Sequence, residues 1–467
     1  MANPVTIRDA MTDPALFGDV FGGQSFTAWR ALLAAFDGLE LTDTELDLFK
    51  SLTGRQNGPQ GAFLELWLAI GRRGGKSHAA AFLAIWLACF FDYRDRLAPG
   101  EVATVMCIAA DRKQARAVMR YTSGLINSNP MLARMVQREN SEQIELNNRT
   151  VIEITTASHR SVRGYTLAAA ILDEIAFWHV DGASPDREII AAIRPALATL
   201  GGRLVALSSP YAKRGVLWDT FRRAFADDGA TRVLVAQAPS RTMNPTLPQH
   251  VIDDAMRDDP EAARAEYLAE FRSDIASFLD VDLLAQCTRP KPLELPPQAG
   301  VQYFGFVDPA GGGADEFTMA IAHREGDAAI IDLVRGLRGS PAQIVAEYAP
   351  VLKSYNVTRV TGDRYAGRWP RDEFEKFGIR YEPSELDRSG LYLELLAAIN
   401  SGRVELPPDD LTVRQFAGLE RRTGRAKDTI DHGPGGHDDR ANSVAGAAVA
   451  ALGKGHGKID YAILTAM

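Results

Sequence analysis

A glycine-rich basic segment constrains this chain more than any other part of its sequence. It reads Gly-Arg-Arg-Gly-Gly-Lys-Ser at 71–77 and lies between an apolar run at 61–70 and an apolar segment at 78–91 that contains no Gly or Pro. The run has strand character, whereas the second segment is too long for one strand and is predicted as a buried helix. This order of strand, glycine-rich loop, Lys-Ser and helix is that of a phosphate-binding loop. We therefore predict a nucleotide site here.

The residue types of this segment fit phosphate chemistry. Glycines let backbone N–H groups turn toward an anion, and a helix N-terminus adds partial positive charge. Lys76 would reach the β- and γ-phosphates, and the Ser77 hydroxyl would hold Mg²⁺. The usual pattern has a glycine where this chain has Ile70. A plain strand-to-helix turn is the alternative interpretation.

Composition is that of an ordinary globular protein. The 467 residues suffice for more than one domain, and 46% of them are hydrophobic and 24% charged. The formal net charge of −8 gives no indication of nucleic acid, although local basic patches can still bind phosphate. Three widely spaced cysteines match no metal or redox motif. We expect no signal peptide, and the longest apolar run, 79–91, is too short to span a bilayer.

The two halves of the chain differ in how strand-like runs are spaced. In the first half, helical segments separate the runs at 61–70, 101–110, 150–157, 167–173, 203–208 and 232–238. This spacing predicts an α/β domain with a mainly parallel sheet. Polar and Pro-containing stretches at 239–248 and 290–297 indicate a linker region. The second half restarts with closely spaced runs at 301–307, 317–323 and 328–334, which predict an antiparallel meander.

A second motif could complete the nucleotide site. The apolar run at 168–172 ends in Asp173 and Glu174. Asp173 would help to hold Mg²⁺, and Glu174 would orient and activate the attacking water. A later run ends in Ser208-Ser209-Pro210, whose hydroxyls would sense the γ-phosphate. The alternatives are a strand that simply ends in acids and an ordinary strand-to-turn signal.

Arginines are the remaining ingredient of ATP hydrolysis, because an arginine can neutralise charge in the transition state. Arg72 and Arg73 lie within the loop, and Arg160 and Arg163 lie just before the strand that ends in Asp-Glu. Each of them is also a candidate for an ordinary solvated arginine.

Three acids in the second half suggest a metal-dependent nuclease. Asp308 and Asp363 each follow an apolar run, and Asp438 and Asp439 precede a small-residue helix at 443–452. Two divalent cations about 4 Å apart need shared carboxylates, so three such acids after a meander point to a ribonuclease-H-like domain. Each acid has a simpler alternative: a turn cap before Pro309 for Asp308, a loop acid for Asp363, and a helix N-cap for Asp438.

Taken together, these motifs resemble the large terminase subunit of tailed bacteriophages, a DNA-packaging motor. The resemblance covers nearly the whole chain and rests on GRRGGKS (71–77), ILDE (171–174), SSP (208–210), FVDP (306–309), TGD (361–363), SGLY (389–392), NSGRVEL (400–406) and GHDDRAN (436–442). It implies an N-terminal P-loop ATPase motor domain at 1–240, a linker or subdomain at 241–298, and a ribonuclease-H-like, mixed-sheet nuclease domain at 299–467. The family commonly departs from the general loop pattern at the position of Ile70.

The resemblance also implies residue roles and cofactors. The nucleotide would be bound by Gly71, Arg72, Arg73, Gly74, Gly75, Lys76, Ser77, Asp173, Ser208 and Ser209. Catalytic roles in ATP hydrolysis would belong to Glu174, to Arg72 and to Arg163 as an arginine finger. ATP with Mg²⁺ on Ser77 and Asp173 would serve the motor. Two Mg²⁺ or Mn²⁺ ions would serve the nuclease on Asp308, Asp363, Asp438 and Asp439, with Asp315 as a further candidate.

Partners and place follow from the same resemblance. It implies double-stranded DNA, the portal protein, the small terminase subunit and a homo-oligomeric ring, which is expected to be a pentamer on the portal, with a monomer in solution as an open alternative. It implies the host bacterial cytoplasm, transiently at the procapsid portal vertex, and no membrane. Two other interpretations stay open: a cellular ATP-dependent helicase-nuclease, and a packaging ATPase whose C-terminal domain only docks on the portal.

Overall fold

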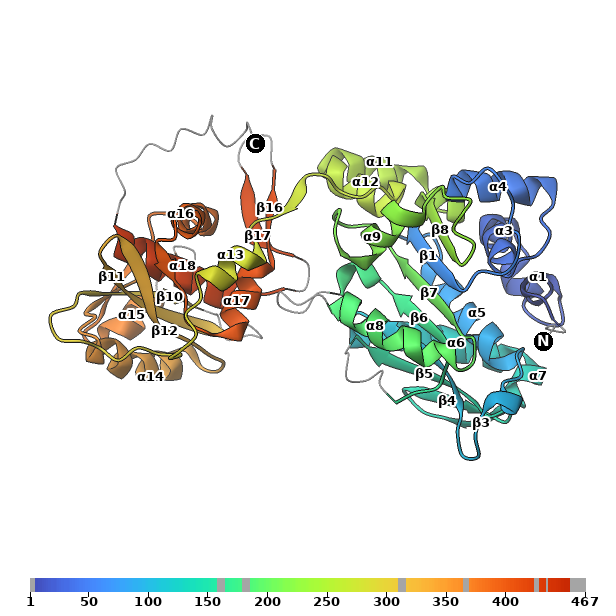
Figure 1. The fold of residues 1–467 in the computed structure, drawn as a ribbon, viewed down its shortest axis with the longest axis horizontal. Coiled ribbons are helices and arrows are strands. Elements are labelled where there is room, and N and C mark those ends of the chain that lie inside the picture. The colour runs from blue at the N-terminus through green and yellow to red at the C-terminus, as the bar shows by residue number, and fades with distance from the viewer. Residues whose placement is uncertain are drawn as a thin grey trace. The chain divides into compact units, whose positions relative to one another are not determined.

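The computed structural model describes residues 5–157, 164–178, 185–309, 316–363, 369–423, 428–433 and 436–453. The chain divides into two compact units, one of Met1–Trp178 with Ser184–Ser273 and one of His179–Ala183 with Asp274–Met467 (Figure 1). The division after Ser273 falls within the segment 241–298 that the sequence predicts as a linker.

The first unit is built on an eight-stranded sheet in the order β3-β4-β5-β2-β6-β7-β1-β8. The strands are β1 (Glu65–Ile70), β2 (Ala103–Ala109), β3 (Val136–Glu139), β4 (Gln143–Leu146), β5 (Thr150–Thr156), β6 (Leu167–Asp173), β7 (Arg203–Ser208) and β8 (Val233–Ala238). Across the sheet from β5 through β2, β6, β7 and β1 to β8, all neighbouring strands are parallel. Strands β3 and β4 add an antiparallel edge beside β5. The predicted mainly parallel sheet is confirmed.

Helices cover both faces of this sheet. They are α1 (Ile7–Thr12), α2 (Gly18–Phe21), α3 (Thr27–Phe36), α4 (Asp43–Thr53), α5 (Lys76–Cys89), α6 (Arg112–Ser128), α7 (Pro130–Ala133), α8 (Pro185–Ala198), α9 (Gly215–Ala224), α10 (Ser240–Met243), α11 (Gln249–Asp258) and α12 (Pro260–Leu268), with short 3₁₀ turns at Gln24–Phe26, Arg94–Arg96 and Ile175–Phe177. Alternate residues of a strand face opposite sides. Leu66 and Leu68 accordingly pack in the core that contains α5, and Trp67 packs in the core that contains α8 and α9 (Figure 1).

Helix α5 is buried on all sides, as the apolar segment at 78–91 predicts. Every residue from Ala79 to Ala88 is at most 3% exposed. A helix that is apolar all round must lie inside a protein. Its burial fixes the helix N-terminus at the end of β1, and the nucleotide site is predicted at that point.

The second unit contains a six-stranded sheet in the order β14-β13-β10-β11-β12-β15 and a three-stranded sheet in the order β17-β16-β9. The strands are β9 (Ile275–Ser277), β10 (Tyr303–Asp308), β11 (Phe317–Glu325), β12 (Ala328–Leu337), β13 (Arg359–Gly362), β14 (Arg380–Pro383), β15 (Val404–Glu405), β16 (Leu419–Arg422) and β17 (Thr429–His432). Strands β10, β11 and β12 form the predicted antiparallel meander, and β13 and β14 extend it in parallel beside β10. The predicted ribonuclease-H-like mixed sheet is confirmed.

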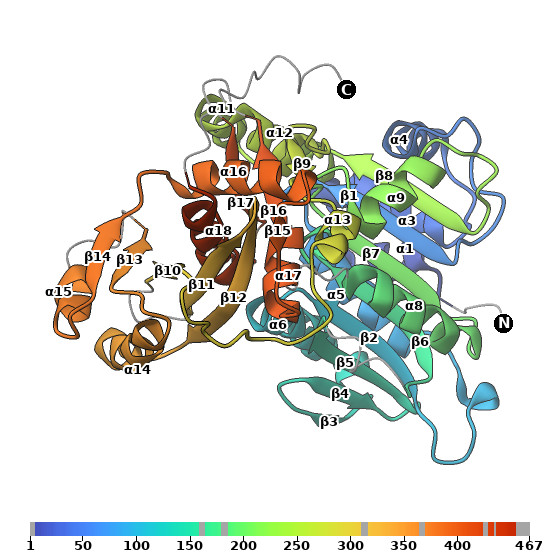
Figure 2. The ribbon, with the colours of Figure 1, turned by 60° about the vertical axis from the view of Figure 1, so that its left-hand side comes forward.

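The helices of this unit are α13 (Val281–Gln286), α14 (Pro341–Ser354), α15 (Trp369–Glu375), α16 (Arg388–Asn400), α17 (Asp410–Ala417) and α18 (Asp439–Leu452). Helices α16 and α18 share a core with one face of the larger sheet, and α14 packs on the other face (Figure 2). Helix α18 approaches β10 so closely that a Cβ on Gly446 would lie 2.1 Å from the Phe306 ring. This contact sets the N-terminus of α18 near the end of β10.

None of the helices in the described part of the chain has the length and apolar character that crossing a lipid bilayer requires.

Candidate functional site

The glycine-rich loop joins β1 to α5 in a turn that only small residues allow. A Cβ on Gly74 would lie 2.7 Å from Ile70 Cγ2 and 2.9 Å from the Gly71 carbonyl oxygen. Gly75 has φ 90°, in the left-handed region that favours glycine. The Trp29 indole donates a hydrogen bond to the Gly74 carbonyl at 2.8 Å, and the Gly71 amide donates to the Ala238 carbonyl of β8 at 3.0 Å. The loop is therefore held on both sides before any ligand is present.

Lys76 is a buried cation at the centre of this loop. The residue is only 6% exposed, and its Nζ donates to the Ile70 carbonyl at 3.1 Å and to Ser209 Oγ at 2.8 Å. The same Nζ lies 3.4 Å from Glu174 Oε1. Ile70, which replaces the usual glycine, is fully buried and contributes its carbonyl to this site.

The two acids at the end of β6 differ in their surroundings. Asp173 is 5% exposed, and its Oδ1 is buried with no hydrogen-bond partner among the described residues. Burial, and then the charge of Glu174, raises the pKa of Asp173 to about 7. Glu174 has φ 53°, and its Oε2 accepts hydrogen bonds from Ser208 Oγ at 3.0 Å and from the Ser209 amide at 3.1 Å.

These contacts bring together residues from three neighbouring parallel strands. Strands β6, β7 and β1 are adjacent in the sheet, and their carboxyl ends carry Asp173-Glu174, Ser208-Ser209 and the loop with Lys76. Ligands of open α/β sheets bind at this edge. A buried ammonium next to the loop, and a buried carboxylate oxygen to which the described residues offer no hydrogen bond, fit a nucleotide phosphate group with Mg²⁺.

The other predicted residues of this site are Arg72, Arg73, Ser77, Arg160 and Arg163. Arg72 is 60% exposed, and its Nη1 lies 3.0 Å from Glu266 Oε2 on α12. Arg73 is exposed and its carbonyl accepts a hydrogen bond from Asn244. Ser77 is half-buried in the first turn of α5. Arg160 and Arg163 lie outside the described residues.

A second cluster of acids lies in the other unit. Asp308 ends β10, and Asp363 follows β13, which pairs in parallel with β10 so that Val307 is opposite Gly362. Asp438 occupies the N-cap position of α18, and Asp439 begins that helix. Asp308 and Asp438 are 7% and 2% exposed.

The side chains of these acids are held by specific partners. Asp308 Oδ2 accepts a hydrogen bond from Asn442 Nδ2 at 2.7 Å. Asp438 makes no capping hydrogen bond, so the N-cap alternative does not explain its carboxylate. Asp438 Oδ2 instead accepts from the Tyr392 hydroxyl at 2.8 Å, and its Oδ1 accepts from Arg388 Nη1 at 3.0 Å.

Burial and like charges set the electrostatics of this cluster. Burial raises the pKa of Asp308 to about 7, and the charges of Asp439 and Asp438 add to this effect against the opposing contributions of Asn442 and Arg388. Around Arg388, burial lowers the pKa of the guanidinium, but the charges of Asp438 and Asp308 outweigh it and raise this pKa overall. Opposite charges therefore stabilise one another in a partly dry site.

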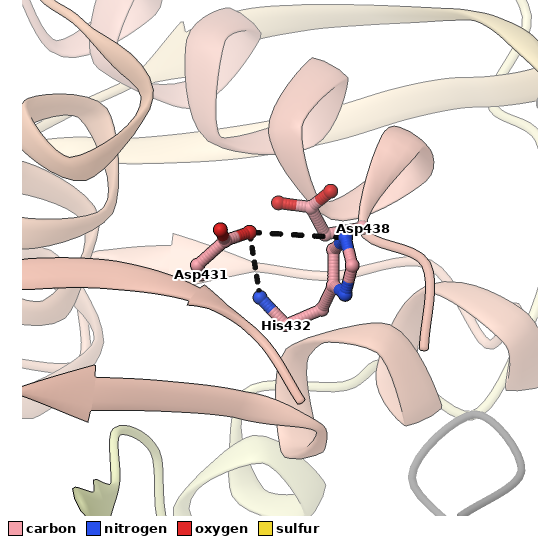
Figure 3. Close-up of side chains that lie close together, drawn as sticks. All are labelled: Asp431, His432 and Asp438. Atoms are coloured by element: carbon pink, nitrogen blue, oxygen red, sulfur yellow. Dashed lines mark hydrogen bonds and ion pairs between the residues drawn. The ribbon is translucent and has the colours of Figure 1, made fainter. Parts of the chain in front are cut away.

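Two further residues approach Asp438 from the end of β17. Asp431, His432 and Asp438 offer ligand atoms that all lie within 4.8 Å of one another (Figure 3). Two of these three residues are carboxylates, and Asp308 and Asp363 supply further carboxylates whose charges also act on Arg388. Such a set fits Mg²⁺ or Mn²⁺.

The predicted acids differ in how the structure places them around Arg388. Asp308, Asp363 and Asp438 all interact electrostatically with Arg388. Asp439 is half-buried beside them, and its carbonyl accepts a hydrogen bond from Thr318 Oγ1 at 2.7 Å. Asp315 lies outside the described residues. Sequence reasoning missed Arg388, Tyr392 and Asn442, although the last two lie in motifs that it quoted, and it missed Asp431 and His432, for which no motif gave a signal.

The fold and the two sites define a class of protein: a P-loop domain with an acidic pair beside its lysine, followed by a ribonuclease-H-like domain with a carboxylate cluster. Residues 68–185 match the family model described as "Terminase large subunit, T4likevirus-type, N-terminal". Over these residues the chain is similar to the N-terminal part of large terminase subunits, and the predicted resemblance is confirmed there.

Solved structures of the same class are similar to this chain at low identity. The large terminase of bacteriophage HK97 is 16% identical, with 90% of this chain and 99% of that chain covered and a TM-score of 0.39. A large terminase of a thermophilic bacteriophage, solved in complex with ADP, is 12% identical, with 90% and 97% covered and a TM-score of 0.40. The large terminase nuclease of the thermophilic phage G20c with bound magnesium is 17% identical, with 36% and 95% covered and a TM-score of 0.32. No curated protein matches the chain.

Proposed function

We propose that this chain is an ATP-driven motor that packages double-stranded viral DNA into a procapsid and that also cuts the DNA concatemer with a two-metal nuclease. The observation that carries the motor is the convergence of Lys76, Glu174 and Ser209 at the carboxyl ends of three parallel strands. The family match over residues 68–185 supports the same assignment.

In the motor domain, proposed at 1–240, each residue has a task that its contacts support. Lys76 would exchange its contacts with Ser209 and Glu174 for the β- and γ-phosphates, and Ser77 and Asp173 would hold Mg²⁺. Glu174 would orient the attacking water. Because Ser208 and Ser209 both bind the carboxylate of Glu174, they would transmit the loss of the γ-phosphate to β7.

Arginine supplies the remaining transition-state charge in this proposal. Arg72 would turn from Glu266 toward the nucleotide, which its exposed position allows. Arg163 would act as the finger, in the same subunit or on its neighbour in a ring. An arginine in this role accelerates hydrolysis by about 10³–10⁵-fold in related phosphoryl-transfer enzymes.

In the nuclease domain, proposed at 299–467 after a linker or subdomain at 241–298, Asp308, Asp363, Asp438 and Asp439 would hold two Mg²⁺ or Mn²⁺ ions. The metal ions supply an activated water and charge stabilisation at the leaving oxygen. Asn442 positions Asp308 by its hydrogen bond, and Tyr392 positions Asp438. The antiparallel meander of this unit differs from a second parallel motor core, which disfavours a helicase-nuclease.

The proposal implies several partners and cofactors. ATP and Mg²⁺ would serve the motor, because the buried Lys76 ammonium and the buried Asp173 Oδ1, which has no partner within the described part of the chain, suit a phosphate group and its metal ion. The DNA, the portal protein, the small terminase subunit and a ring of identical subunits would complete the assembly. It would work in the host bacterial cytoplasm at the portal vertex.

A reciprocal pair of variants tests this proposal. Lys76→Ala should abolish ATP hydrolysis and leave Mn²⁺-dependent plasmid cleavage intact, and Asp308→Ala should do the reverse. Both activities are measured on the same full-length preparations. Retention of ATP hydrolysis in Lys76→Ala, or of cleavage in Asp308→Ala, would contradict the assignment of that site.

A further inference from the structure

Arg388 lies among the acids proposed to hold the nuclease metals. It is the first residue of α16, and its Nη1 lies 3.0 Å from Asp438 Oδ1 and 4.0 Å from Asp431 Oδ1. Its Nη2 lies 3.9 Å from Asp363 Oδ2. The three carboxylates come from the end of β13, the end of β17 and the start of α18, so one guanidinium joins three separate elements.

The charge of the cluster explains why a cation is needed there. Asp308 adds a fourth carboxyl whose charge acts on Arg388, and two of the four acids are almost fully buried. Carboxylates this close repel one another unless a cation lies between them. The ion pairs of Arg388 join three of these acids, whereas the ion pair of His432 is with Asp431.

Arg388 therefore uses the same oxygens that a divalent cation would use. The Asp438 carboxylate accepts Arg388 through both of its oxygens, at 3.0 and 3.3 Å. Metal ligation at about 2.0–2.6 Å would use the same two oxygens, and a guanidinium this close would repel the incoming cation, so Arg388 and a metal ion compete at Asp438. The Arg388 side chain is 36% exposed, which leaves it a path toward solvent when it is displaced.

We propose that Arg388 is a resident counter-ion of the nuclease site: it neutralises Asp363, Asp431 and Asp438 in the metal-free protein, and a divalent cation must displace it to bind. This inference rests on the proposed nuclease site. It makes Arg388 a residue that sets the metal affinity, and it makes Asp431 a holder of the counter-ion. A purely structural arginine would stabilise the cluster without competing with the metal.

The test is Mn²⁺ binding to the full-length protein without nucleotide, measured by isothermal titration calorimetry. Wild type is compared with Arg388→Gln, Arg388→Lys and the control Arg335→Gln. Arg335 has a similar exposure, 42%, and forms a fork-like pair with Glu294 outside the cluster. The site is located by Asp308→Asn, which should remove the binding event that the comparison follows.

Arg388→Gln should bind Mn²⁺ about tenfold more tightly than wild type, because the competing cation is gone. Arg388→Lys should fall between the two, since an ammonium lacks the planar fork, and Arg335→Gln should match wild type. In EDTA, Arg388→Gln should melt at a lower temperature than wild type. Added Mn²⁺ should raise the melting temperature of Arg388→Gln by more than it raises that of the wild type. If Arg388→Gln does not fold, Arg388→Lys carries the comparison.

Two results overturn the inference and are distinguishable. Binding that Asp308→Asn abolishes, but with equal or weaker affinity in both Arg388 variants, would overturn the counter-ion role and leave the proposed nuclease site standing. Absence of any Asp308-dependent binding in wild type and in the variants would overturn the metal site itself, and the inference with it.

Discussion

The two units compensate the charge of clustered carboxylates in different ways. Each collects carboxylates at the ends of strands and places one basic side chain among them: Lys76 beside Glu174 in the first unit, and Arg388 beside Asp438 in the second. Each is the first residue of a helix, but Lys76 belongs to the glycine-rich motif that defines its site, whereas Arg388 begins a helix that bears none of the clustered acids. In our account the substrate phosphates recruit the first cation, and the metal displaces the second.

A basic side chain among carboxylates can therefore either bind the ligand of a site or compete with it. In the first unit the lysine and the site are one motif, so loss of the lysine should remove the function. In the second unit the arginine and the metal compete, so loss of the arginine should strengthen metal binding. Four further sets of variants test whether the two units differ in this way.

The largest effect is expected from Glu174→Gln. Replacing a general base costs about 10²–10⁴-fold in rate, so ATP turnover should fall by that factor. The variant should still bind ATP, because Lys76 and the loop are unchanged, and it should still cleave DNA. Steady-state phosphate release and binding of a fluorescent ATP analogue measure the two properties. Glu261→Gln on α12, an exposed acid that pairs with Arg264, is the control, and turnover in Glu174→Gln equal to this control would remove Glu174 from the mechanism.

Both folded units should become less stable as the pH rises, because each contains an acid, Asp173 or Asp308, whose pKa is raised from 3.8 to about 7 by burial. A raised acid pKa in the folded state contributes stability at low pH that is lost between about pH 4 and pH 7. Asp173→Asn and Asp308→Asn mimic the protonated acids. In EDTA and without nucleotide, the melting temperature of each variant minus that of the wild type should be larger at pH 8 than at pH 5. A variant-to-wild-type difference that is the same at both pH values would contradict the raised pKa of that acid.

A steric change should affect the second unit alone. Gly446→Ala would place its Cβ 2.1 Å from Phe306, and overpacking of this kind costs about 1–3 kcal/mol of unfolding free energy. Nuclease activity should fall with the misplaced α18, while ATP hydrolysis persists. Gly124→Ala is the matched helical control, because apart from its own helix backbone and chain neighbours no described atom would lie within 4 Å of its Cβ. Equal unfolding midpoints in the two variants would show that the α18–β10 contact is looser than described.

The smallest effect is expected at the pair of Arg72 with Glu266. Both side chains are well exposed, 60% and 42%, so Glu266→Ala should change stability by less than about 1 kcal/mol. It should preserve ATP hydrolysis, since it frees Arg72 for the nucleotide, whereas Arg72→Ala should lower it. The rate of ATP hydrolysis and the free energy of unfolding in denaturant are measured for both variants. An equal loss of rate in the two variants would mean that the ion pair itself, and not the free arginine, supports turnover.

How far the sequence predicts the sites depends on the distance between partners along the chain. The loop at 71–77 and the acids at 173–174 are recognisable as local motifs at strand ends, and the parallel sheet then brings them together. Arg72 and Glu266 lie 194 residues apart, and Arg388 and Asp438 lie 50 apart. No local pattern marks such pairs, because only the packed fold sets their distance.

The alternatives for single acids also show what the fold adds. Asp438 stands at the N-cap position that its sequence context predicts, yet Arg388 and Tyr392 hold its carboxylate. Asp308 ends its strand as predicted, but its partner Asn442 lies 134 residues later. Position in an element follows from the sequence, whereas the partner of a side chain follows from the tertiary packing.

Plasmid cleavage in Mn²⁺ by the wild type and by Asp438→Ala, with ATP hydrolysis measured on the same samples, tests whether the two units carry separate activities. The account predicts that the variant loses cleavage and hydrolyses ATP at the wild-type rate, because the two sites are built from separate residues. Equal cleavage by both proteins would contradict the metal-nuclease assignment of the second unit.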